Sequence, residues 1–380
     1  MNIDKRTEFI DAYLQKLNIR PARDGRQFVN VLCNKYDKRI VERIVKLIVE
    51  RPDKTISENY EDDIYELKNY RFDFSVDFIR YNADLYHKYF QWFLSIEHIN
   101  PKRILDIGCE NGFITCFYGL VFPKAEIIGI DPCKNAINCA EEMAKKLKVK
   151  NVTFRKGNLM EAKKLFPPNT FDLVTSVMTF KEIIGSYIQK IIGTPEEYKY
   201  WSLHELDLGV GASQAKTFLD IVNALLTQNG QYISFERWFP EDTVWWADKL
   251  KASGLYVNWD QAEKIAFHEI GEPRVFPAIA ADKRPKEYDY IKETTALWLR
   301  NEPDDEEKLM NLAAETAINN FPKKSFLKGL QCNYADSLLK VRYEFWLSDD
   351  KLLCYQCGNT GYRELRILPV QSGDSITKMI

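Results

Sequence analysis

Apolar residues recur at three- and four-residue spacing in two stretches near the N-terminus, Thr7 to Leu17 and Lys38 to Glu50. This spacing places the apolar side chains on one face, so both stretches are predicted to be helices with one buried side. The acidic run from Ser57 to Tyr70 breaks the pattern and is predicted to be a loop or linker. A further aromatic helix is predicted from Tyr81 to Ile96. Residues 1–84 are therefore interpreted as a helical cap or arm.

The next part of the chain alternates between short apolar strands and helices. Short continuous apolar strands with helical crossovers indicate a parallel sheet covered on both faces. The predicted strands are RILDIG (103–108), EIIGID (126–131), VTFRKG (152–157), FDLVTSVM (171–178) and QYISFE (231–236).

Two further strands, KIAFHEI (264–270) and RVFPAIAA (274–281), are separated by only Gly271-Glu272-Pro273. This connection is too short for a crossover, so the two strands are predicted to form a hairpin that adds an antiparallel strand to the sheet. The pattern over residues 85–284 thus predicts an α/β domain with a doubly wound, mostly parallel seven-stranded sheet and a terminal antiparallel hairpin.

After about Arg284 the pattern predicts a helical segment over residues 287–318. Three alternating segments follow, LLKVRYEFWL, KLLCYQC and YRELRIL, separated by Ser-Asp-Asp and Asn-Thr-Gly turns. Such alternation is typical of a small β meander. Residues 285–380 are therefore predicted to be a C-terminal α+β appendage with a boundary near Arg284.

Lys and Arg residues (53) nearly balance Asp and Glu residues (55), and 45% of the chain is hydrophobic. This is the composition of an ordinary globular protein without the positive field that non-specific phosphate binding requires, so a nucleic-acid partner is not favoured. Basic residues do outnumber acidic ones from Arg20 to Lys54, as on the solvated face of an amphipathic helix. The charged start and the lack of a long apolar stretch predict a cytoplasmic protein that does not cross a membrane.

Cys354 and Cys357 form one C-x-x-C pair, and Cys332 would supply a third ligand for zinc. No second pair and no nearby His completes a four-ligand set. The other cysteines are scattered, and several fall in the α/β pattern, where reduced thiols behave as small apolar residues. The sequence therefore predicts neither a metal site nor a disulfide framework.

The turn after the first predicted strand reads Asp106-Ile107-Gly108-Cys109-Glu110-Asn111-Gly112. In an open parallel sheet this turn lies at the carboxyl edge, where glycines let the backbone approach a ligand and a helix N-terminus presents free amides. The next strand ends in Asp131, at about the separation at which an acidic residue reaches both hydroxyls of a ribose. A nucleoside ligand is therefore expected at this edge.

A nicotinamide or flavin site would require G-x-G-x-x-G, but Glu110 and Phe113 occupy the second and third glycine positions. The sequence D-I-G-C-E-N-G followed by I-G-I-D instead resembles the class I S-adenosylmethionine-dependent methyltransferase family, and the terminal antiparallel hairpin is typical of the same family. The chain departs from the family pattern at Glu110, where many members have Gly.

The resemblance implies that S-adenosylmethionine is the cofactor and that it binds along this edge. Asp131 would bind the ribose, and Pro132 would lie against the adenine. Asn158 stands where the family commonly has an Asp that accepts a hydrogen bond from the adenine amino group, and the Asn carbonyl can accept that bond too. Asp106, Gly108 and Gly112 would surround the methionine moiety. The implied cofactor-binding residues are Asp106, Gly108, Cys109, Gly112, Asp131, Pro132, Asn158, Leu159 and Val177.

The sequence says less about the methyl acceptor, because methyl transfer from a sulfonium depends on aligning the acceptor and excluding water more than on particular side chains. The fourth strand lacks both the Asn/Asp-Pro-Pro-Tyr motif that holds a flipped base and a Pro-Cys nucleophile, which excludes base methylation of those kinds. The insertion from Lys181 to Asp220 has the size of a lid, and a small-molecule or protein acceptor fits best. Within it, His204 and Glu182 are the candidate acid–base residues.

Four aromatic residues follow the fifth strand, and they are interpreted either as core packing or as an aromatic acceptor pocket. They are Trp238, Phe239, Trp245 and Trp246. Two other functions stay open at this point. One is an RNA methyltransferase that uses the basic N-terminal arm, and the other is a catalytically idle methyltransferase-like subunit that binds a protein partner.

Overall fold

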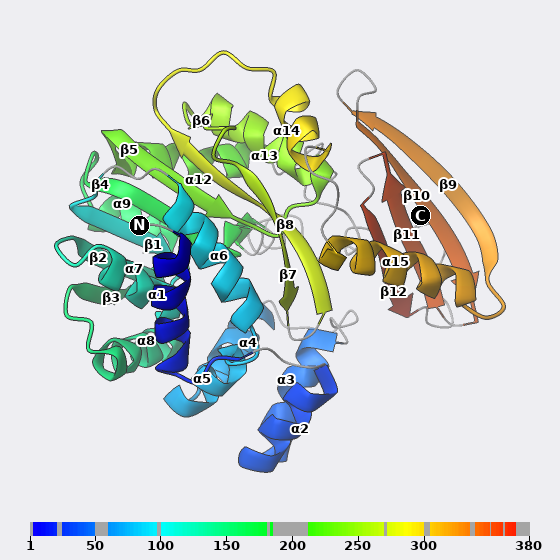
Figure 1. Ribbon diagram of the computed structural model, residues 1–380, viewed down its shortest axis with the longest axis horizontal. Helices are drawn as coiled ribbons and strands as arrows, with labels where there is room; N and C mark the ends of the chain where they lie inside the picture. The colour runs from blue at the N-terminus through cyan, green and yellow to red at the C-terminus, as the bar shows by residue number, and fades with distance from the viewer. Residues whose placement is uncertain are drawn as a thin grey trace.

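A central sheet covered by helices on both faces and a second, smaller sheet make up the computed structural model of the protein (Figure 1). None of the helices in the described part of the chain is both long enough and apolar enough to span a membrane. The structure describes residues 3–20, 25–49, 60–96, 100–180, 183–184, 212–269, 272–299, 305–334, 339–349, 351–359 and 362–369.

The central sheet has the strand order β3-β2-β1-β4-β5-β8-β6, with β7 paired to β8. Strands β1 to β5 run parallel, and β8 is antiparallel to both β5 and β7. The predicted parallel sheet with a terminal antiparallel hairpin is therefore confirmed. The strands are β1 Arg103–Ile107, β2 Glu126–Asp131, β3 Val152–Lys156, β4 Phe171–Val177, β5 Leu226–Phe235, β6 Tyr256–Val257, β7 Glu263–Glu269 and β8 Glu272–Asp282.

The sheet has eight strands rather than the predicted seven. The additional strand, β6, is only two residues long and pairs with the end of β8 at Asp282 and Ala281. A segment this short carries no alternation of apolar and polar residues, and for this reason the sequence pattern did not reveal it.

Successive side chains of a strand point to opposite faces, and both faces of this sheet are buried. Ile104 of β1 joins a core with helices on one face of the sheet, whereas its neighbour Leu105 joins a second core. The helices of the first core are α1 (Ile3–Gln15), α6 (Ala83–Ser95), α7 (Phe113–Val121) and α8 (Lys134–Leu147). The second core contains α9 (Leu159–Leu165), α12 (Ala212–Leu225) and α13 (Pro240–Ala252). Each face is thus covered by helices, as the continuous apolar strands predict.

The aromatic residues after β5 belong to the second core. Trp238 and Trp246 are fully buried and Trp245 is 5% exposed. The ring of Trp238 lies 5.2 Å from that of Trp246 and 5.7 Å from that of Trp245. Core packing is therefore confirmed for these three tryptophans, and Phe239 packs at the edge of a smaller cluster.

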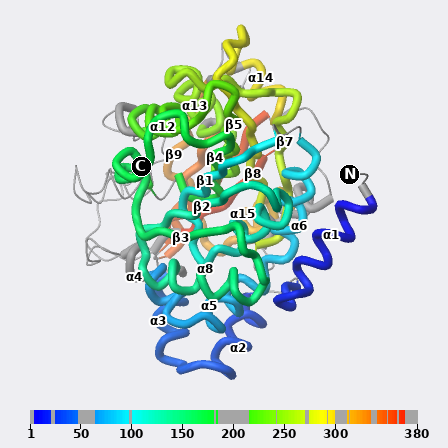
Figure 2. The backbone as a smooth tube through the Cα atoms, turned by 90° about the vertical axis from the view of Figure 1, so that its left-hand side faces the viewer, coloured from blue at the N-terminus to red at the C-terminus, as the bar shows by residue number. Residues whose placement is uncertain are grey.

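Six helices precede β1 in the described part of the chain. α1 and α6 pack on the sheet, whereas α2, α3 and α5 form a cluster of their own around Phe28, Phe74 and Phe78. In Figures 1 and 2, α2 and α3 lie at the end of the molecule opposite α12 to α14. The helices are α1 Ile3–Gln15, α2 Gly25–Lys35, α3 Lys38–Val49, α4 Tyr60–Lys68, α5 Phe72–Ile79 and α6 Ala83–Ser95.

The predicted loop from Ser57 to Tyr70 is wrong, because α4 lies within it. Leu67 packs against the cluster of α2, α3 and α5, and Asn135 of α8 donates a hydrogen bond to the carbonyl oxygen of Glu66. These contacts join residues distant in sequence, so the local spacing of apolar residues does not reveal them.

The C-terminal region contains two helices and a four-stranded antiparallel sheet in the order β12-β11-β10-β9. The predicted meander is confirmed as β10 to β12, whereas β9 was not predicted, because nearly all its side chains are exposed and it lacks alternation. The boundary near Arg284 stays a prediction. The elements are α14 Tyr290–Leu299, α15 Asp305–Asn320, β9 Ser325–Tyr334, β10 Leu339–Ser348, β11 Lys351–Gly358 and β12 Arg363–Pro369.

Candidate functional site

The turn between β1 and α7 takes its shape from three residues in left-handed backbone conformations. Their φ angles are +70° at Gly108, +44° at Glu110 and +75° at Gly112. The amides of Gly108 and Cys109 donate to the carbonyl oxygen of Ile130 at 2.9 and 3.0 Å, which ties the turn to the end of β2. Two of the three positions are glycines, for which this conformation carries no steric cost.

The two glycines face different surroundings. A Cβ on Gly108 would overlap the side chain of Thr179, which follows β4, so the glycine allows close approach at the carboxyl edge. A Cβ on Gly112 would lie 2.7 Å from the Phe154 ring and 2.8 Å from Ala140. Gly112 is therefore needed for packing of the turn against β3 and α8, whereas Gly108 borders the space where the strand ends meet.

Asp131, the last residue of β2, is held by backbone amides on both sides. Its Oδ2 accepts a hydrogen bond from the Glu110 amide at 3.0 Å, and its Oδ1 accepts one from the Cys133 amide at 2.9 Å. The side chain is 7% exposed. Burial raises the pKa of Asp131 to about 7, while the two amide hydrogen bonds oppose that change. Each oxygen keeps one acceptor position for a ligand.

Asp106 instead uses its carboxylate within the protein. It is 2% exposed and accepts hydrogen bonds from the hydroxyls of Thr115 at 2.5 Å and Thr175 at 2.9 Å. Burial raises the pKa of Asp106 to about 6, and the two hydroxyls act in the opposite direction. The carboxylate therefore links α7 to β4 beneath the turn.

Asn158 is the N-cap of α9. Its Oδ1 accepts from the amide of Glu161 at 3.0 Å, and Glu161 Oε2 accepts from the amide of Asn158 at 3.0 Å. The preceding residue, Gly157, donates its amide to the backbone oxygen of Asp131, which places this turn beside the end of β2. The oxygen predicted to meet the adenine thus already has a structural partner, although an amide oxygen can accept a second bond.

The remaining predicted cofactor-binding residues lie along the same edge with different exposure. Pro132 is exposed, whereas Leu159 is buried in the second core. Cys109 is 5% exposed and packs against Gly129 of β2. Val177 ends β4 and is half-buried. The structure thus brings the predicted set together at the ends of β1 to β4.

One buried acid at this edge was not among the predicted site residues. Glu236 follows β5 directly and is fully buried. Its Oε1 accepts from the Ser176 hydroxyl at 2.7 Å, and its Oε2 accepts from the amides of Thr179 at 2.8 Å and Phe180 at 3.0 Å. An acidic residue that ends an apolar strand is the sequence signal that would have identified it.

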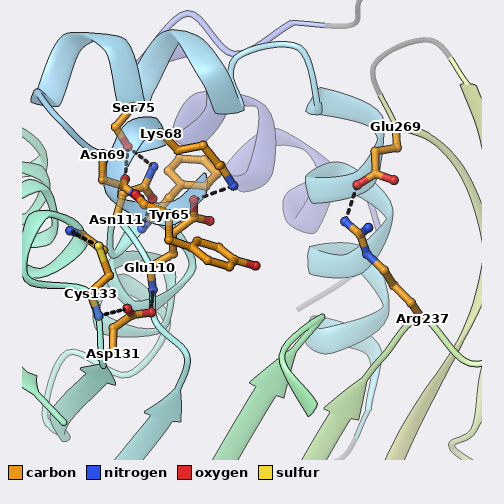
Figure 3. A network of polar contacts seen from close by, with 12 residues as sticks. Tyr65, Lys68, Asn69, Ser75, Glu110, Asn111, Asp131, Cys133, Arg237 and Glu269 are labelled. Atoms are coloured by element: carbon orange, nitrogen blue, oxygen red, sulfur yellow. Dashed lines mark hydrogen bonds and ion pairs between the residues drawn. The ribbon is translucent and has the colours of Figure 1, made fainter. Parts of the chain in front are cut away.

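The N-terminal cap reaches the turn through Lys68, the last residue of α4 (Figure 3). Its ammonium lies 2.7 Å from Oε1 of Glu110. Beside it, the Asn111 amide group donates to Ser75 at 2.9 Å, and the Ser75 hydroxyl donates to Asn69 at 2.6 Å. The turn after β1 is therefore linked by side chains to α4 and α5.

A second ion pair lies across the strand ends from this network (Figure 3). Arg237, just after β5, contacts Glu269, the last residue of β7, at 2.7 Å. Strand β7 is antiparallel to β8, which is antiparallel to β5, so both residues lie at the carboxyl edge. Burial raises the pKa of Tyr86 on α6 well above its usual value, and the carboxylates of Glu110 and Glu269 add to the effect.

The two predicted acid–base residues, Glu182 and His204, lie outside the described residues, as does most of the insertion around them. Among the described residues, none of the eight cysteines is joined in a disulfide. Within the described ranges, no three His, Cys, Asp or Glu side chains are grouped as metal ligands would be.

Comparison with known proteins identifies one region of the chain. Residues 100–191 match the family model described as a methyltransferase domain. An uncharacterized methyltransferase of Schizosaccharomyces pombe is 40% identical over 80 residues, which are 20% of this chain and 28% of that protein. The chain thus matches little more than a quarter of the length of this relative.

Solved structures with a similar arrangement are more distant. A methyltransferase described as SAM-dependent, from Aquifex aeolicus, is 20% identical, with a TM-score of 0.32 over 47% of this chain and 81% of that one. A putative methyltransferase in complex with the Haloferax volcanii activator Trm112 is 11% identical, with a TM-score of 0.40 over 61% of this chain and 100% of that one.

Proposed function

We propose that the chain, whose residues 100–191 match a methyltransferase domain, binds S-adenosylmethionine at the ends of β1 to β4 and transfers its methyl group to a small-molecule or protein acceptor. S-adenosylmethionine is the methyl donor of class I methyltransferases. The observation that carries the proposal is Asp131, whose carboxylate is fixed by the amides of Glu110 and Cys133 at the sheet edge.

The residues present fit this donor. Both oxygens of Asp131 can accept a further hydrogen bond, which matches the two hydroxyls of a ribose. Pro132 and Asn158 are exposed beside it, where an adenine would lie. Gly108 lets the turn approach the Thr179 side chain at the end of β4 closely, and in this proposal the methionine moiety lies beside that contact.

The chemistry asks little else of the protein. The donor supplies a methyl group already activated by the positive sulfur, so the protein must align the acceptor for in-line displacement and exclude water. In this proposal the acceptor lies above the ends of β4 and β5, on the side of the Arg237–Glu269 pair. Glu182 and His204 remain the proposed acid–base residues for an acceptor that must lose a proton. A cytoplasmic location stays a prediction.

Calorimetry with S-adenosylmethionine and S-adenosylhomocysteine tests the donor site. Asp131→Ala is expected to weaken both about ten- to a hundredfold, because a charge-assisted contact to two hydroxyls is lost. Asp172→Ala is the matched control. Asp172 also accepts two backbone amide bonds, from Lys102 and Arg103, but at the opposite edge of the sheet. Absence of binding by the parent protein would refute the proposed function, whereas equal affinity in Asp131→Ala would remove the ribose assignment.

A further inference from the structure

Lys68 occupies a confined position against the turn after β1. The side chains of Lys68 and Glu110 are only 17% and 26% exposed, and the ammonium lies 5.1 Å from the centre of the Tyr65 ring and 5.0 Å from that of Phe78. Partly buried charges are screened less by water than surface charges, so their attraction is stronger. Removal of one partner leaves the other charge partly buried without compensation.

The carboxylate that Lys68 binds belongs to the residue whose backbone holds Asp131. Glu110 has a φ of +44°, a conformation that residues other than glycine adopt uncommonly. In this conformation its amide donates to Asp131 Oδ2 at 3.0 Å. The side chain and the backbone of Glu110 thus connect Lys68 on one side with Asp131 on the other.

Independent contacts fix α4 at this place. Asn69, next to Lys68, donates to the backbone oxygen of Tyr65 at 3.0 Å and accepts from Ser75. Asn135 on α8 donates to the backbone oxygen of Glu66 at 3.2 Å. The end of α4 is therefore attached both to the turn and to the helix that follows Asp131 (Figure 3).

We propose that Lys68 is a positioning residue of the donor site, which holds the turn after β1 through Glu110 so that Asp131 is placed for the ribose of the donor. This inference rests on the proposed function. It makes α4 part of the donor site.

The charges around Asp131 give Lys68 a second effect. Asp131 is faced by Glu110 and Cys109 from the turn, by Cys133 from the start of α8, and by Lys68 from α4. Glu66 of α4 faces Cys133. The Lys68 ammonium lowers the pKa of Asp131 and so favours the ionised carboxylate. The Glu110 carboxylate raises that pKa and so favours the protonated acid.

The first test is the affinity for S-adenosylhomocysteine by calorimetry at pH 7. Lys68→Met is expected to weaken binding at least tenfold, and Lys68→Arg, which keeps the charge, to stay within about threefold of the parent. Lys35→Met is the matched control, because Lys35 forms an ion pair with Asp77 in the same cap but away from the turn. It should bind within about twofold of the parent.

The second test is the pH dependence of that affinity, which a purely structural role of α4 would not move. Lys68→Met should raise the pH at which half of the affinity is lost, because the ammonium that lowers the pKa of Asp131 is removed. Glu110→Gln should lower that midpoint pH, and it should also weaken binding at high pH. The double variant should bind no more weakly than Lys68→Met alone. If Lys68→Met does not fold, Glu110→Gln and Lys68→Arg carry the same test.

Affinity within twofold of the parent and an unmoved midpoint in Lys68→Met would overturn the inference and leave the proposed function intact. A parent protein that does not bind S-adenosylhomocysteine would overturn both.

Discussion

Two buried carboxylates at the same sheet edge, Asp131 after β2 and Glu236 after β5, are held in similar ways but differ in what they leave free. Each accepts two backbone amide hydrogen bonds. Glu236 is fully buried, and its other oxygen accepts from the Ser176 hydroxyl, whereas Asp131 is 7% exposed and each of its oxygens accepts one amide. In the proposed donor site, this difference separates an acid that organises the edge from one that binds the ribose.

The largest effect expected from this comparison is on stability. Glu236→Ala leaves the amides of Thr179 and Phe180 without an acceptor in a fully buried place, so we expect a loss of about 3–5 kcal/mol in the free energy of unfolding. Asp131→Ala should cost less, about 1–2 kcal/mol, because its surroundings are closer to solvent. Urea denaturation monitored by circular dichroism measures both.

Glu236→Gln is the control for this experiment, since its amide group keeps one acceptor oxygen and should recover part of the loss. Equal stability of the parent and Glu236→Ala would show that the amides of Thr179 and Phe180 find other partners, and the contrast between the two acids would disappear.

A second expected effect is the pH dependence of donor binding. Burial raises the pKa of Asp131 to about 7. Ribose hydroxyls donate to the ionised carboxylate, so affinity should rise with pH up to about 7, be nearly constant above it, and fall by up to tenfold per unit below it. Donor binding should also release protons near neutral pH, which appears as a dependence of the binding enthalpy on the ionisation enthalpy of the buffer.

Asp131→Asn separates this titration from that of Asp106, whose pKa is raised to about 6 by burial. The variant should bind more weakly but without the step near pH 7. A parent affinity that is constant from pH 6 to 8 would mean that the protonated acid serves the ribose equally well.

The stability of the fold depends on the ionisation of Asp131 in the opposite sense to donor binding. The pKa of Asp131 is higher in the folded state than in the unfolded chain, so ionisation of Asp131 destabilises the folded state. Its contribution declines as pH rises from about 4 to about 7 and is constant above. Donor binding and stability therefore respond to the same titration in opposite directions.

The sequence was sufficient for the parts of the molecule in which local pattern and structure coincide. β1, β2 and β4 are mostly apolar runs, and the turn from Gly108 to Gly112 is marked by glycines at two of its three left-handed positions. Helix α4 and strand β9 escaped prediction for opposite reasons: α4 is stabilised by contacts with distant residues, whereas β9 has exposed side chains on both faces.

The candidate site also has residues that local sequence identifies and residues that it does not. Asp131 could be located because it ends the second predicted strand, at the expected separation from the turn after the first strand. The ion pair of Lys68 with Glu110 joins residues 42 positions apart, and the hydrogen bonds of Glu236 join residues 56 to 60 positions apart. No local periodicity encodes such pairs. Sequence reasoning therefore found the donor edge but not the residues that support it.

The smallest expected effect concerns Asn158, for which two roles must be separated. Asn158 caps α9 by accepting from the Glu161 amide, and the family resemblance also assigns it a bond from the adenine amino group. Asn158→Asp can fill both roles and should keep or tighten donor binding. Asn158→Leu loses both roles, at a cost of about 1 kcal/mol in stability for the cap and about two- to tenfold in donor affinity.

Asn158→Ser separates the two roles, because serine is a good N-cap residue but its hydroxyl is too short to occupy the place of the amide oxygen. We expect Asn158→Ser to keep the parent melting temperature and to bind S-adenosylhomocysteine about three- to tenfold more weakly. Parent-like affinity in this variant would assign Asn158 to the cap alone and leave adenine recognition to the backbone and Pro132.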